Sequence, residues 1–246
     1  MSLNKVINFD FTSLYPQTFK KILNINPIYR KDKIKKYSMK DLNKKIKDRL
    51  DFYIEFDSDE LFQCGDFIKV FGGAVRDSIA EMEINDIDIL CAPNSHKRLS
   101  NLLLEKGYKL NDYLCGKHLN QMYKSVNNIS EPHTFIKGDK IIQLIRPRVN
   151  EQHGIDFRVV FNRLVENVDI SCCGVSYGKN GLKEEYKNAI LHCQNLVFSK
   201  NLSGSMYDYN RWIHRSIKLE KRGWKEIEDT TSNNRDLKIQ NIIDEW

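Results

Sequence analysis

The stretch that decides the fold runs from Val70 to Asp77 and reads VFGGAVRD, and it is followed closely by NDIDI at positions 85–89. The apolar run Phe67–Phe71 ends at two adjacent glycines, which predicts a strand that enters a tight turn. Residues Ala74–Met82 predict a helix, and residues Asn85–Ala92 alternate as a strand does. We therefore expect a strand, a glycine bend, a helix and a second strand in direct succession.

The second strand carries two carboxylates. Successive side chains of a strand alternate between its faces, so Asp86 and Asp88 share one face, and Ile87 and Ile89 share the other. The two aspartate Cα atoms are about 6.5–7 Å apart, because each residue advances about 3.3 Å. The isoleucine face predicts burial. The carboxylates either face solvent on an edge strand or hold two Mg²⁺ (or Mn²⁺) ions for phosphoryl transfer.

The glycine bend supplies a complementary feature, which is a place for phosphates. Because glycine has no Cβ, Gly72 and Gly73 let a ligand approach the backbone, and amides at a helix N-terminus attract anions. Arg76 lies in the first turn of the predicted helix, where its guanidinium can bind a phosphate through two hydrogen bonds. The combination of strand, Gly-Gly, helix and Asp-x-Asp strand is far more specific than either motif alone.

Apolar spacing predicts the elements around this centre. An amphipathic helix is expected over Met39–Tyr53, and a helix capped by Ser95 is expected to run to Lys106. Residues 135–146 predict a hairpin. A strand is expected over Asp169–Tyr177, and a helix from Tyr207 to about Glu228.

These elements predict an α+β fold, with a small mixed β-sheet flanked by helices and a short C-terminal helical appendage. We divide the chain into a basic N-terminal arm (1–38), a catalytic domain (39–182) and a helical C-terminal region (183–246).

Composition is typical of a globular protein. The chain has 246 residues, 41% hydrophobic and 29% charged, and no apolar run is long enough for a transmembrane helix. The N-terminus lacks a basic start followed by an apolar stretch, so we expect no signal peptide and a cytoplasmic location. A Lys-, Asn- and Ile-rich chain also suits a phage protein in an infected host. The six cysteines form no CxxC pair, and we expect them to be reduced.

The net charge of +6 is unevenly distributed. Residues 20–49 carry a net charge of +9, so the rest of the chain carries about −3. A local basic patch suits a polyanion such as RNA. The alternative is the solvated lysine-rich face of a helix.

A second basic feature lies on the C-terminal helix. Four cationic side chains fall on one helical stripe: Arg211, Arg215, Lys218 and Arg222. Such a stripe could hold a triphosphate or an RNA backbone if it faces the carboxylates. The alternative is an ordinary amphipathic surface helix.

Residues 72–77 (GGAVRD), followed by residues 86–89 (DIDI), resemble the signature of the polymerase-β-like nucleotidyltransferases. Within that superfamily they are most similar to the branch of CCA-adding tRNA nucleotidyltransferases and bacterial poly(A) polymerases. The resemblance implies catalytic metal ions on Asp86 and Asp88. It also implies nucleotide-binding roles for Gly72, Gly73, Arg76, Asp77, Arg215, Lys218 and Arg222.

Two further positions are compared through this resemblance. The segment that begins at Asp169 is similar to the family's segment in which an Asp precedes a strand of small residues, and it implies a catalytic role for Asp169. The two arginines that the family carries before this Asp are replaced by Asn167 and Val168. Gln143 stands where the family often has a third acidic residue, so Asp169 or Asp156 could assist the metal pair.

Two functions are compatible with these observations. The first is a template-independent nucleotidyltransferase that moves a nucleoside monophosphate from a nucleoside triphosphate to an acceptor hydroxyl, with an RNA 3′ end as the expected acceptor. The second is a nucleotide- or RNA-binding protein that retains the fold with reduced catalysis, which Gln143 and the missing arginine pair favour. Neither function involves a membrane.

Overall fold

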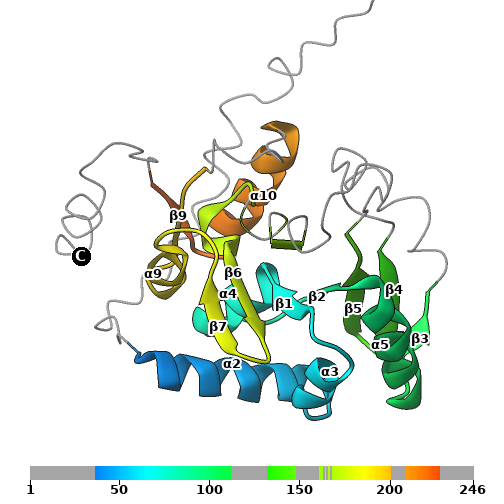
Figure 1. Ribbon diagram of the computed structural model, residues 1–246. Coiled ribbons are helices and arrows are strands. Elements are labelled where there is room, and N and C mark those ends of the chain that lie inside the picture. The colour runs from blue at the N-terminus through cyan, green and yellow to red at the C-terminus, as the bar shows by residue number, and fades with distance from the viewer. Residues whose placement is uncertain are drawn as a thin grey trace, which may run out of the picture. The chain divides into compact units, whose positions relative to one another are not determined.

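Figure 1 shows the computed structural model of the chain. It describes residues 37–111, 132–147, 168–200 and 209–227, with single positions at 161, 162, 164 and 166. For residues 209–211 only the backbone is described. The chain divides into two units, residues 1–31 and 32–246, and all described residues belong to the second. Most of the predicted N-terminal arm, Asn167 and Asp156 lie outside the described residues.

A seven-stranded mixed sheet forms the centre of this unit, in the order β3-β4-β5-β2-β1-β6-β7. β2 and β5 run parallel, whereas the other neighbouring strands are antiparallel. β8 and β9 form a separate parallel pair. The strand bounds are β1 Ile68–Phe71, β2 Ile87–Cys91, β3 Lys109–Leu110, β4 His133–Lys137, β5 Lys140–Ile145, β6 Val175–Gly178, β7 Gly181–Glu184, β8 Val197–Phe198 and β9 Lys225–Glu226.

Helices flank this sheet, which confirms the predicted fold class of a mixed sheet with surrounding helices. In Figure 1, β3–β5 and the β6–β7 hairpin lie at opposite ends of the sheet. The helix bounds are α2 Met39–Ile54, α3 Asp59–Gln63, α4 Gly73–Ile79, α5 Pro93–Glu105, α9 Ala189–Gln194 and α10 Tyr209–Lys221. None of these described helices has the length and apolar character needed to cross a membrane.

The helix predicted over Met39–Tyr53 is confirmed as α2. The Ser38 hydroxyl caps its N-terminus by accepting a hydrogen bond from the Asp41 amide, 3.2 Å away. The helix packs against α4 and β7 (Figure 1). Burial of each large aliphatic side chain contributes about 1.5–3 kcal/mol, so packing of the apolar stripe holds this helix in place. Its buried residues are Leu42, Ile46, Leu50 and Ile54.

The strands that carry the decisive motifs also form as predicted. Ile87 and Ile89 of β2 are 0% exposed, and Asp88 between them is half-buried on the opposite face. The hairpin predicted over residues 135–146 is formed by β4 and β5, which pair from His133 with Leu144 to Lys137 with Lys140. The alternation that predicted burial of the isoleucines is therefore confirmed.

Two predicted elements differ from the structure in their bounds. α5 begins at Pro93 with Ala92 as its N-cap, rather than at Ser95, because proline is well suited to the first helical position. The segment predicted as one strand from Asp169 forms a 3₁₀ turn over Ser171–Cys173 before β6 begins. Ser171 ties this turn to the residue that follows β8, because its hydroxyl accepts the Ser199 amide at 2.9 Å and its amide donates to the Ser199 carbonyl at 3.0 Å.

The C-terminal part of the chain also differs from the prediction. α10 ends at Lys221, and the chain turns at Gly223, where φ is +88°, before it enters β9. The division of the chain into an arm, a catalytic domain and a C-terminal region stays a prediction.

Candidate active site at the glycine bend

The glycine bend follows β1 directly. Gly72 adopts φ 67° and ψ −123°, a conformation that glycine reaches because it lacks a Cβ. Its amide donates to the Val175 carbonyl of β6 at 3.1 Å, and its carbonyl accepts the Arg76 amide at 3.0 Å. The bend is therefore fixed by backbone contacts on both sides.

The aspartate pair lies beside this bend. Asp88 pairs in the ladder with Phe71 of β1, the residue that immediately precedes Gly72. Asp86 lies one residue before β2 and is half-buried. The register thus places Asp88 next to the end of β1, and Asp86 lies two residues earlier in the chain.

On its other side, Asp88 pairs with Gln143 of β5. Gln143 is 7% exposed and pairs in turn with the buried Thr134 of β4. Side chains paired in this way share one face of the sheet, so an amide stands beside Asp88 where the family resemblance implies a third acid. No group of three metal-binding side chains occurs among the described residues.

Tyr53 of α2 is a residue of this site that sequence reasoning placed only in an apolar stripe. Its hydroxyl donates to the Asn85 carbonyl at 2.8 Å and accepts the Ile141 amide at 2.9 Å. Burial raises the pKa of Tyr53, the Ile141 amide opposes this, and the charge of Asp86 adds to the rise. The phenol therefore links the N-terminal ends of β2 and β5 through hydrogen bonds, close to Asp86. A tyrosine at the last turn of a predicted helix gave no signal for this contact.

Arg76 and Asp77 of α4 form a buried ion pair. Two guanidinium nitrogens of Arg76 donate to the two carboxylate oxygens of Asp77, at 2.7 and 2.9 Å. Arg76 is 7% exposed and Asp77 is 2% exposed. Burial alone lowers the pKa of Arg76, but the charges of Cys173 and Asp77 raise it above its ordinary value. The guanidinium predicted to contact phosphate is thus held by a neighbouring carboxylate.

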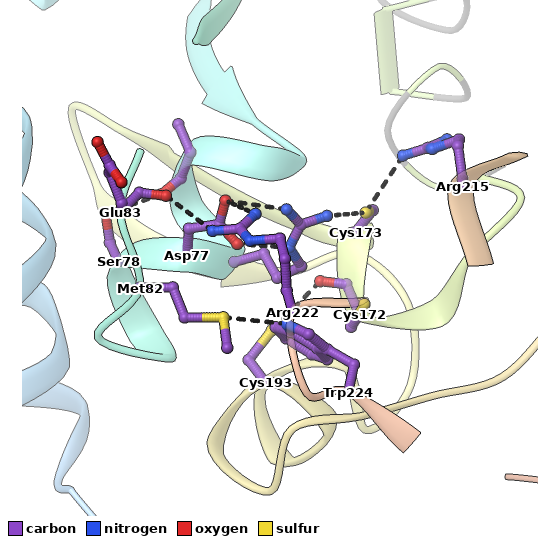
Figure 2. Close-up of polar contacts among 12 residues, drawn as sticks. Asp77, Ser78, Met82, Glu83, Cys172, Cys173, Cys193, Arg215, Arg222 and Trp224 are labelled. Carbon is purple, nitrogen blue, oxygen red and sulfur yellow. Dashed lines mark hydrogen bonds and ion pairs between the residues drawn. The ribbon is translucent and has the colours of Figure 1, made fainter. Parts of the chain in front are cut away.

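Asp77 also binds the turn that directly follows α10. Arg222 donates to Asp77 at 2.8 Å and to the Glu83 carbonyl at 2.8 Å. Figure 2 shows Asp77 at the centre of these contacts, with Arg222 reaching it from the turn after α10. The Trp224 ring lies 5.5 Å from the Arg76 guanidinium carbon. The structure therefore brings together three predicted nucleotide-binding residues in one network between α4 and the C-terminal end of α10.

A second ion pair joins α10 to the segment before β6. Arg215 forms an ion pair with Asp169, which is 2% exposed. Arg215 also donates to the Cys173 sulfur at 3.3 Å (Figure 2). The structure thus places Asp169 against Arg215, and not among the cross-strand neighbours of Asp88 on the sheet. Lys218 is exposed on α10, and the side chain of Arg211 lies outside the description.

In the described part of the basic segment, two lysines of α2 are paired with carboxylates. Lys45 contacts Glu81 at 2.7 Å, and Lys47 contacts the carboxylates of Asp51, Asp57 and Asp59. The main effect on Lys47 is burial, which lowers its pKa, but the hydrogen bonds to these carboxylates raise it beyond its ordinary value. The charges of Lys45 and Lys47 are therefore offset within this domain, whereas Lys40 and Lys44 are exposed.

Solved structures share this fold. A CCA-adding enzyme in an apo form is 19% identical with a TM-score of 0.51, and the match covers 74% of this chain and 40% of that chain. A complex of a CCA-adding enzyme with CTP is 17% identical with a TM-score of 0.53, covering 79% of this chain and 44% of that chain. This chain thus spans less than half the length of these proteins. No protein-family model and no curated protein matches the sequence.

These likenesses show that the chain has the polymerase-β-like nucleotidyltransferase fold. The resemblance inferred from residues 72–77 and 86–89 is confirmed at the level of the fold. The roles of the individual residues remain predictions.

Proposed function

We propose that this chain is a template-independent nucleotidyltransferase that transfers a nucleoside monophosphate from a nucleoside triphosphate to an acceptor hydroxyl. One observation carries the proposal. On a nucleotidyltransferase fold, the β1–β2 register sets Asp88 beside Phe71, at the entrance to the glycine bend. Carboxylates next to a backbone that a ligand can approach are what phosphoryl transfer requires.

Asp86 and Asp88 would hold a divalent cation, Mg²⁺ or Mn²⁺. The donor set fits, because Mg²⁺ is commonly bound through one or two carboxylates together with substrate phosphates. Gln143 would add a neutral amide oxygen beside Asp88. A cation bound there would lower the pKa of the acceptor hydroxyl and offset charge on the phosphates.

The chain's own groups would bind and orient the nucleotide. The backbone of Gly72 and Gly73 would receive the triphosphate, since nothing lies within 4 Å of the place a Cβ would occupy on Gly72. Arg76, Asp77 and Arg222 would hold α4, and with it the bend, through their ion pairs. Lys218 is exposed on α10 and would be available to a phosphate. Asp169 and Arg215 would orient each other.

An RNA 3′ end is the acceptor we propose. The related fold of a CCA-adding enzyme bound to CTP supports a nucleotide substrate. On α2, the exposed side chains of Lys40 and Lys44 remain candidates for a polyanion, together with the basic residues 20–36.

The test is label transfer from each α-³²P-labelled nucleoside triphosphate, with Mg²⁺, to bulk RNA and to tRNA. We expect transfer by the wild type and a loss of at least about 10²-fold in Asp86→Asn and Asp88→Asn, because each removes a charge that the transition state needs. Asp66→Asn is the control. This exposed carboxylate lies just before β1 begins, at the end of the β1–β2 pair that is remote from the glycine bend. Equal transfer by all four proteins would refute the proposal.

The second candidate is a nucleotide- or RNA-binding protein without transfer activity, and the neutral Gln143 beside Asp88 favours it. It predicts salt-sensitive RNA binding by wild-type protein in the same assay and no label transfer with any nucleotide.

A further inference from the structure

We infer that Cys173 is a thiolate in the folded protein and acts as the positioning residue that joins α4 to α10. The inference is independent of the proposed function. Its sulfur accepts hydrogen bonds from Arg76 on α4 and from Arg215 on α10, each at 3.3 Å. A neutral thiol is a weak acceptor, whereas a thiolate between two guanidiniums makes two charge-assisted contacts.

The charges in the surrounding network favour an additional anion. Its described guanidiniums are those of Arg76, Arg215 and Arg222, and its described carboxylates are those of Asp77 and Asp169. One positive charge is therefore in excess among these buried or half-buried groups. Because an uncompensated charge is expensive to bury, ionisation of the central sulfur lowers the free energy of the folded state.

Neighbouring groups on the other elements are compatible with one thiolate at this position. A hydrogen bond from Cys172 lowers the pKa of Cys173, and the charges of Arg76 and Arg215 lower it further. Together they outweigh the effect of burial and bring this pKa to about 5. Burial raises the pKa of Cys172 and of Cys193 on α9, so both remain thiols. The Cys193 thiol donates to the Cys172 carbonyl at 3.2 Å (Figure 2).

Two other titratable groups lie close by. His192 of α9 contacts the Ser171 hydroxyl at 2.7 Å, and burial lowers its pKa to about 4, so it is neutral. Glu184 of β7 acts on Cys193 through its charge. Neither supplies a cation or an anion in contact with the Cys173 sulfur.

The position of Cys173 explains what the thiolate would do. The residue lies two positions before Val175, whose carbonyl accepts the Gly72 amide. The sulfur therefore holds Arg76, and through it Asp77, on the same short segment that fixes the glycine bend.

The experiment is the ultraviolet absorbance of the thiolate, near 240 nm, in full-length protein between pH 4 and 9. We expect the wild type to have a thiolate band at pH 7 that disappears on acidification with a midpoint near pH 5. Cys173→Ser should lack this band. Cys91→Ser is the matched control and should keep it, because burial raises the pKa of the Cys91 thiol to about 12.

Equal absorbance of wild type and Cys173→Ser at pH 7 would overturn the inference. If Cys173→Ser does not fold, cysteine ¹³Cβ resonances of labelled wild-type protein give the same information. One resonance that titrates near pH 5 supports the thiolate, and titration of every cysteine above pH 7 contradicts it.

Discussion

Asp77→Asn tests whether the network between α4 and α10 is a unit of stability. Asp77 is 2% exposed and binds Arg76 through two hydrogen bonds and Arg222 through one. An asparagine of the same shape presents an amide N–H to one guanidinium and removes the carboxylate charge that Arg76 and Arg222 share. Loss of one partner of a buried ion pair costs about 3–5 kcal/mol of unfolding free energy.

Arg222→Gln gives the second corner of a double-mutant cycle. The Arg222 side chain is 19% exposed and makes single bonds to Asp77 and to the Glu83 carbonyl, so we expect a smaller loss of about 1.5–3 kcal/mol. The double variant should lose less than the sum, by about 0.5–3 kcal/mol, because both substitutions remove one shared contact. Asp57→Asn is the control, since this 58% exposed carboxylate forms a surface pair worth about 1 kcal/mol or less.

The assay is urea unfolding followed by circular dichroism, with the midpoint and slope fitted for each variant. In thermal unfolding the Asp77→Asn loss corresponds to a fall in Tm of about 6–20 °C for a chain of this size. A loss within about 1 kcal/mol of that in Asp57→Asn, or strict additivity with Arg222→Gln, would refute the account of the network.

Three further predictions concern the site and the acid response. Gln143→Glu places a third carboxylate beside Asp88. It should lower the Mg²⁺ concentration needed for half-maximal transfer by about tenfold, or 1.4 kcal/mol. An unchanged Mg²⁺ concentration at half-maximal transfer would contradict this role of position 143. Gly72→Ala and Gly138→Ala each strain a residue with positive φ and an open Cβ position, at about 1–3 kcal/mol of stability, but only Gly72→Ala should abolish transfer. Burial lowers the pKa of His96 and of His192 to about 4. Between pH 6.5 and 4 the unfolded chain therefore binds more protons than the folded chain. The free energy of unfolding consequently falls as the pH falls through that window. The double variant with glutamine at both positions should show a shallower fall, by up to about 1.4 kcal/mol per pH unit for each histidine, whereas an unchanged slope from urea unfolding at each pH would count against buried neutral imidazoles.

The local patterns in the sequence predicted the centre of the fold well. The stripe predicted from Met39 to Tyr53 located the buried Leu42, Ile46 and Leu50, although Met39 is exposed, and the alternation around Asp88 located the buried isoleucines. Such patterns report contacts of one element with the core, so periodicity is sufficient to find them. The bend at Gly72 was also predictable, because its conformation requires glycine.

The missed features depend on partners far away in the sequence. The turn at Ser171 is held by a contact to Ser199, and no local pattern reports that bond. Arg76 was predicted to contact phosphate, but it is held by the adjacent Asp77 and by Cys173, and only the second contact, across 97 positions, is long-range. Tyr53 likewise reaches Ile141 across 88 positions. Long-range polar contacts of this kind override local propensity, and single-residue spacing carries no information on them.

Mn²⁺ binding measured by electron paramagnetic resonance, with and without a nucleoside triphosphate, tests the central claim most directly. We expect the wild type and the Asp66→Asn control to bind Mn²⁺ more tightly when nucleotide is present, because the carboxylates of β2 and the phosphates at the bend would share the ion. The Asp86→Asn/Asp88→Asn variant should lose this binding while its circular dichroism spectrum stays native. Undiminished Mn²⁺ and nucleotide binding in that variant would contradict the account.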